Sequence, residues 1–281
     1  MKSEKTYFFL SGLPRSGITL LGAILNQNPD IYVGATSPVL QFMKLFAHYY
    51  KNHINNYFPK EEFRKKTLTR ICDDWYSDID SPIIIDKNRG WSYNLTEAEI
   101  ITKDIKIICP VRSILDILSS WILLNRKSSE KENYGNGTEL TALDYNLKAN
   151  GERVTDNNLC HSLMDGGVGG MVYIPLNGLA QLFNENQELF QNIIHLVEYE
   201  DLISDTKNSI NKIYEFLQIP KYEHDYDNIE NNLPEDEMAR FGYGMPTLHE
   251  VRPTISKNIN NPLEVLDKNI IKQYSGLEFW R

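Results

Sequence analysis

Short continuous runs of apolar residues, each followed by polar or small residues, mark the positions where buried strands are expected. Runs of this length that lack alternation are typical of strands covered on both faces, as in a parallel sheet. We expect four such strands, at residues 7–11, 83–85, 105–111 and 193–197. The second of these ends directly on Asp86 and Lys87, so charged side chains arrive at a strand end.

Apolar residues three and four positions apart lie between these strands and predict helices. The clearest case covers residues 18–28 and stops before Pro29. The same spacing predicts further helices at residues 38–58, 113–125, 174–190 and 206–217. Strands that alternate with helices indicate an α/β fold, with a mainly parallel sheet flanked by helices. We assign residues 1–281 to a single domain of this kind.

Two stretches show neither pattern. Residues 126–140 are rich in Gly, Asn, Ser, Lys and Glu, and we interpret them as a surface loop. Residues 221–262 are irregular, and a short helical segment follows Asn260-Asn261-Pro262.

Composition narrows the possible classes of function. The chain has 29 Lys and Arg against 38 Asp and Glu, and a net charge of −9 disfavours a nucleic-acid footprint or a polybasic membrane surface. Three cysteines without a C-x-x-C pair indicate neither a disulfide framework nor a metal site. The sequence has no membrane-length apolar stretch and no signal-peptide pattern. We therefore expect a cytoplasmic protein without metal, nucleic-acid or membrane partners, and the oligomeric state stays open.

The most informative segment follows the first strand and reads Ser11-Gly12-Leu13-Pro14-Arg15-Ser16-Gly17-Ile18-Thr19-Leu20. A glycine turn that opens a helix presents backbone amides and partial positive charge, so it binds phosphate groups. The glycines and Thr19 match the triphosphate-binding loop G-x-x-x-x-G-K-[ST], but Ile18 replaces its lysine. Without that lysine the loop suits one phosphate group better than three. Arg15 is then the cation of the loop, and its planar fork matches phosphate or sulfate oxygens.

This segment resembles the 5′-phosphosulfate loop of the sulfotransferases that use 3′-phosphoadenosine-5′-phosphosulfate (PAPS). It is most similar to the branch with Pro-Arg-Ser-Gly-x-Thr, which includes tyrosylprotein and many bacterial sulfotransferases, whereas cytosolic members usually carry lysine in place of Arg15. The resemblance implies a P-loop-like sulfotransferase fold and PAPS as co-substrate. It also implies donor-binding positions at Pro14, Arg15, Ser16, Gly17, Ile18, Thr19 and Leu20.

Two later segments resemble the same family in the expected order. In the family's 3′-phosphate segment an arginine at a strand end is followed eight positions later by a serine, which implies that role for Arg112 and Ser120, with Ser119 as the alternative hydroxyl. Tyr199, in Tyr-Glu-Asp-Leu after the last strand, matches the tyrosine beside the adenine, where an aromatic ring stacks on a flat base. Without the family, a helix-capping arginine and a surface serine would be the ordinary interpretation.

Residues 247–257 resemble the family's late loop, which closes over the nucleotide. The resemblance implies Ser256 and Lys257 as further donor-binding residues, with Arg252 a weaker candidate. A surface turn of the same composition is the alternative. The matched pieces run from residue 7 to about residue 257.

Sulfuryl transfer requires an acceptor aligned with the leaving phosphate and cations that stabilise charge on the bridging oxygen. We hypothesise that Arg15 and Lys87 supply this charge, since the related enzymes place a lysine at the end of the corresponding strand. Their usual base, a histidine two residues further on, is replaced here by Arg89, which stays protonated.

The general base is therefore the least defined part of the site. Asp86, His48 and His249 are the titratable candidates, none with a decisive spacing, and we rank Asp86 first. The glutamate that tyrosylprotein sulfotransferases place after the first helix has no counterpart in Gly34-Ala35-Thr36-Ser37.

These observations predict a sulfotransferase that moves a sulfuryl group from PAPS to a hydroxyl or amine. The acceptor is a small molecule or a peptide, and the sequence does not choose among a small alcohol, a sugar, a lipid head group and a peptide tyrosine. Two alternatives remain. One is a small-molecule kinase or nucleotide hydrolase with a degenerate phosphate loop, and the other is an inactive nucleotide-binding module.

Overall fold

The computed structural model describes residues 5–54, 60–129, 155–166, 170–231, 251–255 and 260–281. Five parallel strands form one sheet in the order β2-β3-β1-β4-β5. They are β1 (Thr6–Leu10), β2 (Ile31–Val33), β3 (Ile83–Lys87), β4 (Ile107–Val111) and β5 (Ile194–Glu198). This sheet confirms the predicted parallel α/β architecture, while the assignment of the whole chain to one domain stays a prediction.

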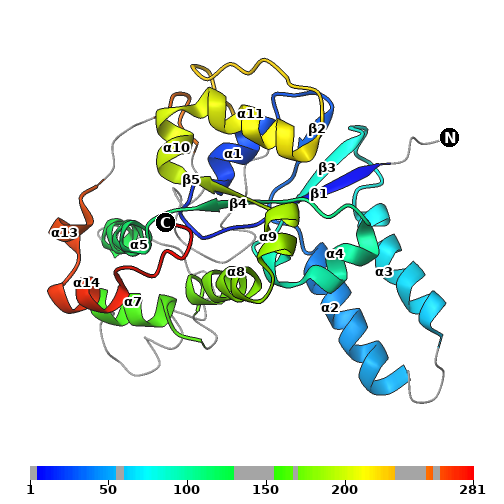
Figure 1. Ribbon diagram of the computed structural model, residues 1–281, viewed down its shortest axis with the longest axis horizontal. Coiled ribbons are helices and arrows are strands. Elements are labelled where there is room, and N and C mark those ends of the chain that lie inside the picture. The colour runs from blue at the N-terminus through cyan, green and yellow to red at the C-terminus, as the bar shows by residue number, and fades with distance from the viewer. Residues whose placement is uncertain (1–4, 55–59, 130–154, 167–169, 232–250, 256–259) are drawn as a thin grey trace.

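Helices flank both faces of the sheet (Figure 1). Before β3 the chain forms α1 (Ile18–Leu25), α2 (Val39–Tyr49), the π-helical turn η1 (Tyr50–Ile54) and α3 (Glu61–Trp75). Between β3 and β5 it forms η2 (Trp91–Tyr93), α4 (Leu95–Ile101), α5 (Ile114–Ser129), α7 (Asp156–Leu163), α8 (Tyr173–Glu185) and α9 (Gln187–Ile193). After β5 come α10 (Tyr199–Ser204), α11 (Thr206–Leu217), α13 (Pro262–Val265) and α14 (Lys268–Tyr274).

Alternation along β1 divides the apolar core between the two faces of the sheet. Phe8 and Leu10 belong to a cluster with residues of α1 and α11, whereas Tyr7 and Phe9 belong to a cluster with residues of α2, α3, α5 and α8. Successive strand residues point to opposite faces, and both faces here are covered. For this reason every residue of β1 after Thr6 is buried, and the strand is a continuous apolar run.

The glycine turn lies at the carboxyl end of β1, between the ends of two other strands. β1 pairs with β3 on one side and with β4 on the other, and Leu10 lies opposite Lys87. In open α/β sheets, ligands bind outside the carboxyl ends of strands where the strand order changes direction. The segments that follow β1, β3 and β4 therefore meet at the edge where a ligand is expected.

Several elements differ in detail from the sequence-based expectation. The chain forms the three-residue strand β2, too short to give a pattern. α5 continues to Ser129, so the start of the expected loop 126–140 is helical, and the rest of that loop lies outside the described residues. The helix expected at 174–190 divides at Asn186, whose side chain accepts a hydrogen bond from the amide of Leu189 and caps α9. The helix expected at 38–58 is α2 followed by η1, and residues 55–58 lie outside the described ranges.

Three further findings concern the described part of the chain alone. None of its helices combines the length and the apolar character needed to cross a membrane. Within the same ranges, no three His, Cys, Asp or Glu side chains are grouped so that they could hold a metal ion. Cys72, Cys109 and Cys160 are free thiols buried in the core.

Candidate functional site

The turn between β1 and α1 uses left-handed backbone at three positions. Gly12, Arg15 and Gly17 have φ values of 104°, 60° and 85°. Only glycine adopts such values without strain, and a strained non-glycine residue is a recurrent feature of ligand sites. Gly12 also lies against the next strand, because a Cβ at this position would overlap the carbonyl oxygen of Pro110. The backbone of the turn is thus held close to β4 at the start of α1.

The remaining residues of the predicted loop brace this turn. Pro14 and Ser16 are buried, and residues 18–20 form the first turn of α1. Ser16 Oγ lies 2.5 Å from the carbonyl oxygen of Leu13 and 2.8 Å from that of Pro110. The hydroxyl of Ser16 therefore serves the backbone of the turn, and its amide is the group that can face a ligand.

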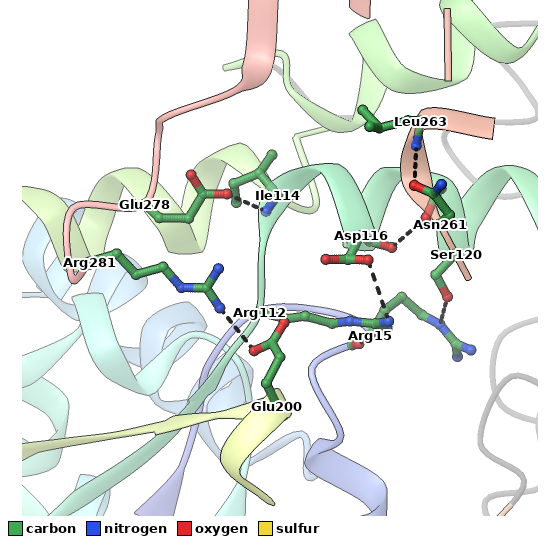
Figure 2. A network of polar contacts seen from close by, with 11 residues as sticks. Arg15, Arg112, Ile114, Asp116, Ser120, Glu200, Asn261, Leu263, Glu278 and Arg281 are labelled. Carbon is green, nitrogen blue, oxygen red and sulfur yellow. Dashed lines mark hydrogen bonds and ion pairs between the residues drawn. The ribbon is translucent and has the colours of Figure 1, made fainter. Parts of the chain in front are cut away.

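Arg15 connects the turn to the predicted 3′-phosphate segment (Figure 2). Its Nε donates to Ser120 Oγ at 3.2 Å, and its carbonyl oxygen accepts a hydrogen bond from Arg112 Nη1 at 3.3 Å. Ser120 lies on α5, two turns after the strand end that carries Arg112. The structure therefore brings together the arginines at positions 15 and 112 and the serine at position 120, as the family resemblance implies.

Arg112 is buried without a full set of hydrogen-bond partners. Its side chain follows β4 and is 9% exposed, and Nη2 lies 4.0 Å from Asp116 Oδ1. Among the described residues, neither Arg112 Nε nor Asp116 Oδ1 has a hydrogen-bond partner. A buried guanidinium that retains an unused donor is suited to an anion, since an unpaired buried polar group is costly.

Tyr199, the first residue of α10, packs between the turn and Arg112. The Arg112 guanidinium lies 4.3 Å from the centroid of the Tyr199 ring, which is a cation–π contact. On the other side, a Cβ at Gly17 would come within 3.0 Å of a ring carbon of Tyr199. The glycine at position 17 thus serves both the left-handed turn and the close approach of this ring.

Lys87, the last residue of β3, is buried on the face of the sheet that α1 covers. It is 7% exposed and lies opposite Leu10, whose side chain packs in the α1 cluster. Partners directly opposite in a parallel ladder share a face, so Lys87 extends toward the side on which the glycine turn enters α1. Its carbonyl oxygen also accepts a hydrogen bond from the amide of Ser37 at 2.9 Å.

A comparison with known families identifies this arrangement. The family described as Sulfotransferase domain matches residues 5–257, a range that contains the glycine turn and the residues that surround it. The chain belongs to the sulfotransferase family. No curated protein matches the chain.

Solved structures are similar to this sulfotransferase family member at low identity. The sulfotransferase domain from the Synechococcus PCC 7002 olefin synthase is 16% identical, with a TM-score of 0.50 over 88% of this chain and 87% of that one. The sulfotransferase from Alicyclobacillus acidocaldarius is 12% identical, with a TM-score of 0.49 over 83% and 87% of the two chains. The first likeness shows the sulfotransferase fold and does not extend to the acceptor.

Asp86, expected as the general base, is enclosed in the core of the sulfotransferase fold. The side chain is fully buried, and Oδ2 accepts hydrogen bonds from the hydroxyls of Ser37 at 2.5 Å and Tyr76 at 2.7 Å. Oδ1 accepts a hydrogen bond from the indole of Trp91 at 2.6 Å. Burial raises the pKa of Asp86, and the three donors oppose that rise. Since Lys87 is its neighbour on the strand, the two side chains point to opposite faces, and the geometry favours a structural role for Asp86 over that of a base.

Other predicted candidates are exposed or lie outside the described residues. Ser256, Lys257 and His249 belong to the ranges that the structure does not describe, and their assignments stay predictions. His48 is exposed on α2, where its ring contacts the side-chain amide of Asn52. Arg252 is exposed in the segment that follows β5 and α11.

Two residues near the end of the chain border the site, and no sequence motif predicted them. Glu278 accepts a hydrogen bond from the amide of Ile114 at 2.7 Å and so caps α5, the helix that carries Ser120 (Figure 2). Arg281 pairs with Glu198 at 2.7 Å and with Glu200 at 2.9 Å, the two residues that flank Tyr199. These contacts join segments more than 80 residues apart in sequence, which local patterns do not reveal.

Proposed function

We propose that this family member transfers a sulfuryl group from PAPS to a hydroxyl or amine of an acceptor. The observation that carries the proposal is the convergence of Arg15, Arg112, Ser120 and Tyr199 around one glycine turn. Two guanidinium groups lie within one hydrogen-bonded network, although the chain as a whole carries a charge of −9. An acidic protein that concentrates cations at a strand edge is equipped for an anionic ligand.

Each group then has a distinct task in donor binding. The amides of the turn, with Arg15, hold the 5′-phosphosulfate at the start of α1. Arg112 and Ser120 hold the 3′-phosphate, and the unpaired Arg112 Nε supports this role because it offers a buried donor. The ring of Tyr199 supplies a flat apolar face for the adenine.

The transfer itself requires positive charge near the bridging oxygen. When bound, the donor supplies a sulfuryl group: the acceptor oxygen or nitrogen attacks sulfur, the bond from sulfur to the 5′-phosphate oxygen breaks, adenosine 3′,5′-bisphosphate leaves, and the acceptor proton passes to solvent. Arg15 and Lys87 then stabilise the charge that develops on the phosphate, Arg15 from within the glycine turn and Lys87 from the end of β3, the strand that pairs with β1. Asp86 contributes by fixing the end of β3 from the opposite face.

The kinase alternative is less well supported by the same residues. Ile18 occupies the position of the lysine that reaches the terminal phosphates of a triphosphate, and it forms the first residue of α1. An inactive nucleotide-binding module would differ from the proposed enzyme only in catalysis. A measurement of sulfate transfer therefore separates the two, whereas a measurement of ligand binding does not.

One thermal-stability experiment separates these functions. The melting temperature is measured with adenosine 3′,5′-bisphosphate, with ATP and Mg²⁺, and with neither, because a ligand that binds only the folded protein raises it. We expect an increase with the bisphosphate and none with ATP and Mg²⁺. The opposite result would favour the kinase alternative. Transfer of radiolabelled sulfate from PAPS to a panel of alcohols, sugars and phenols then distinguishes an enzyme from a binding module.

Arg112→Ala tests the assignment of the 3′-phosphate group. We expect the variant to lose the bisphosphate-induced shift, which at about 100 times the dissociation constant corresponds to about 2.7 kcal/mol. Arg112→Lys keeps the charge but not the forked geometry, so a partial shift is expected. Arg70→Ala, a change at an exposed arginine of α3, is the matched control. A full shift in the Arg112→Ala variant would contradict the assignment.

A further inference from the structure

The helices α2 and α3 expose an unusual concentration of large apolar side chains. Of the twelve large hydrophobic residues that are exposed in the described part of the chain, five lie on these two helices. They are Phe42, Leu45, Tyr49, Phe63 and Trp75, with exposed fractions of 47%, 67%, 56%, 53% and 44%. Single exposed apolar residues are common on protein surfaces, but a cluster marks an interaction site.

These side chains form a continuous surface, which we call the α2–α3 patch. Phe42, Leu45 and Tyr49 are three and four residues apart, so they share one face of α2. Phe42 contacts Trp75 of α3, with ring centroids 6.3 Å apart, which joins the two helices. Phe46, which is half-buried on α2, contacts Phe63 in the same way at 6.4 Å. The patch therefore extends over both helices.

Positive charge accompanies the patch. Residues 39–75 contain seven Lys and Arg against four Asp and Glu, a net charge of +3, so the rest of the chain carries −12. Lys66 and Arg70 are exposed three and seven residues after Phe63, so they lie on the same face of α3 as its ring, where the exposed Asp74 follows four residues after Arg70. The patch thus combines exposed aromatic rings with cations in a protein that is otherwise acidic.

The shape of this region suits a broad surface. Figure 1 shows α2 and α3 extending away from the sheet as a projecting pair of helices. A pair of helices that projects in this way can be approached by a broad partner. Aromatic and leucine side chains with flanking Lys and Arg are the composition of helices that lie in the interface of an anionic bilayer.

We propose that the α2–α3 patch binds the surface of an anionic lipid bilayer, with its rings in the headgroup region and its cations against lipid phosphates. The net charge of −9 led us to expect no membrane contact, but that figure is the sum of +3 on residues 39–75 and −12 on the rest of the chain. A second copy of this chain is a poorer occupant, because two positive patches would face each other. This proposal does not depend on the proposed transfer reaction.

Vesicle flotation tests the proposal with the full chain. We expect co-flotation with vesicles of phosphatidylcholine and phosphatidylglycerol, no co-flotation with phosphatidylcholine alone, and release at high salt. Leu45→Glu changes the apolar part of the patch, and the double variant Lys66→Glu/Arg70→Glu changes its cations. Each variant should reduce binding to the anionic vesicles about tenfold or more. Leu263→Glu on α13 is the matched control, since Leu263 is 63% exposed outside the patch, and it should bind as the unaltered chain does.

Tryptophan fluorescence gives a second measurement that depends on the patch itself. Trp75 is 44% exposed, whereas Trp91 and Trp121 are 0% and 6% exposed, and Trp280 is half-buried outside the patch. Anionic vesicles should shift the emission to shorter wavelength, and Trp75→Phe should remove the shift without removing flotation.

Three results would overturn the proposal. The first is absence of binding to the anionic vesicles, and the second is equal loss of binding in the Leu263→Glu control. The third is a dimer in solution that Leu45→Glu dissociates, which would assign the patch to a second copy. Far-UV circular dichroism of each variant confirms that a loss of binding is not a loss of fold.

Discussion

Asp86 and Lys87 are adjacent charged residues at the end of β3, yet their surroundings differ completely. Asp86 lies in the core beneath α2 and α3 and receives three hydrogen bonds, whereas Lys87 lies on the face covered by α1. Alternation along a strand accounts for this, because neighbouring side chains point to opposite faces. Of these two adjacent charges, only Lys87 lies on the face that α1 covers, so the transfer role that we propose is given to Lys87 and not to Asp86.

Lys87→Ala should affect turnover far more than donor binding. If Lys87 stabilises charge that develops during transfer, its loss should lower kcat about a hundredfold or more while the bisphosphate-induced rise in melting temperature is retained. Lys103→Ala, at an exposed lysine after α4, provides the control. Sulfate-transfer kinetics and melting curves measure the two effects, and equal losses in both would remove Lys87 from the transfer step.

Substitutions of Asp86 should reveal its structural role. Asp86→Ala leaves the hydroxyls of Ser37 and Tyr76 and the indole of Trp91 without their acceptor, so we expect a loss of about 3 kcal/mol in the free energy of unfolding. Asp86→Asn keeps an acceptor oxygen and should cost about 1 kcal/mol. Urea unfolding measures both, with Asp104→Ala at an exposed carboxylate as the control. An Asp86→Ala variant as stable as the unaltered chain would rule out this role.

At the scale of elements, the sequence predicts best those segments whose pattern has a local cause. Four strands, with the helices α1 and α11, follow from apolar runs and helical spacing, because burial imposes the pattern. The helix α3 buries only Leu68 and Cys72, so its sequence carries little apolar periodicity. Arg15 and Ser120 could be assigned to one site only through the family resemblance, and the contact of Glu278 with the start of α5 depends on how elements pack and has no signal along the chain.

The glycine turn allows a test of backbone strain against packing. Gly12→Ala should lower the free energy of unfolding by about 2 kcal/mol or more, because its positive φ is strained for alanine and the new Cβ overlaps the backbone of Pro110. Gly276→Ala is the matched control, since Gly276 also has a positive φ, 76°, but nothing within 4 Å of an added Cβ. The free energy of unfolding of that variant should fall by only about 1 kcal/mol. Equal losses in urea unfolding would show that the contact with β4 does not constrain the turn.

At the scale of the whole molecule, segments without regular structure complete the packing of the sheet. The segment that follows α11 returns over the α1 face, where its His224 is 8% exposed. His224 Nε2 lies 3.1 Å from the hydroxyl of Tyr214, which in turn accepts a hydrogen bond from Asn28 at 3.0 Å. This chain of contacts joins the end of α1 to α11 and to the returning segment, so the stability of that face depends on a titratable group.

The ionisation of His224 should make the fold less stable in mild acid. Burial lowers the pKa of His224 below its ordinary value of about 6.5, so the unfolded chain binds this proton more readily than the folded protein. The contribution of His224 to stability is therefore fully present above about pH 6.5, and it declines as the pH falls from there toward the lowered pKa. His224→Gln keeps a polar side chain near Tyr214 but cannot titrate.

Urea unfolding of both proteins at about pH 7.5 and about pH 5.5 measures this contribution. At the higher pH the imidazole is neutral in both the folded and the unfolded state. The difference in the free energy of unfolding between the unaltered protein and His224→Gln at this pH therefore gives the baseline cost of the substitution. We expect this difference in the free energy of unfolding to narrow at the lower pH, because protonation of His224 destabilises the unaltered protein, whereas the glutamine of the variant does not titrate. A difference that stays constant between the two pH values would show that the proton on His224 is not excluded by the folded state.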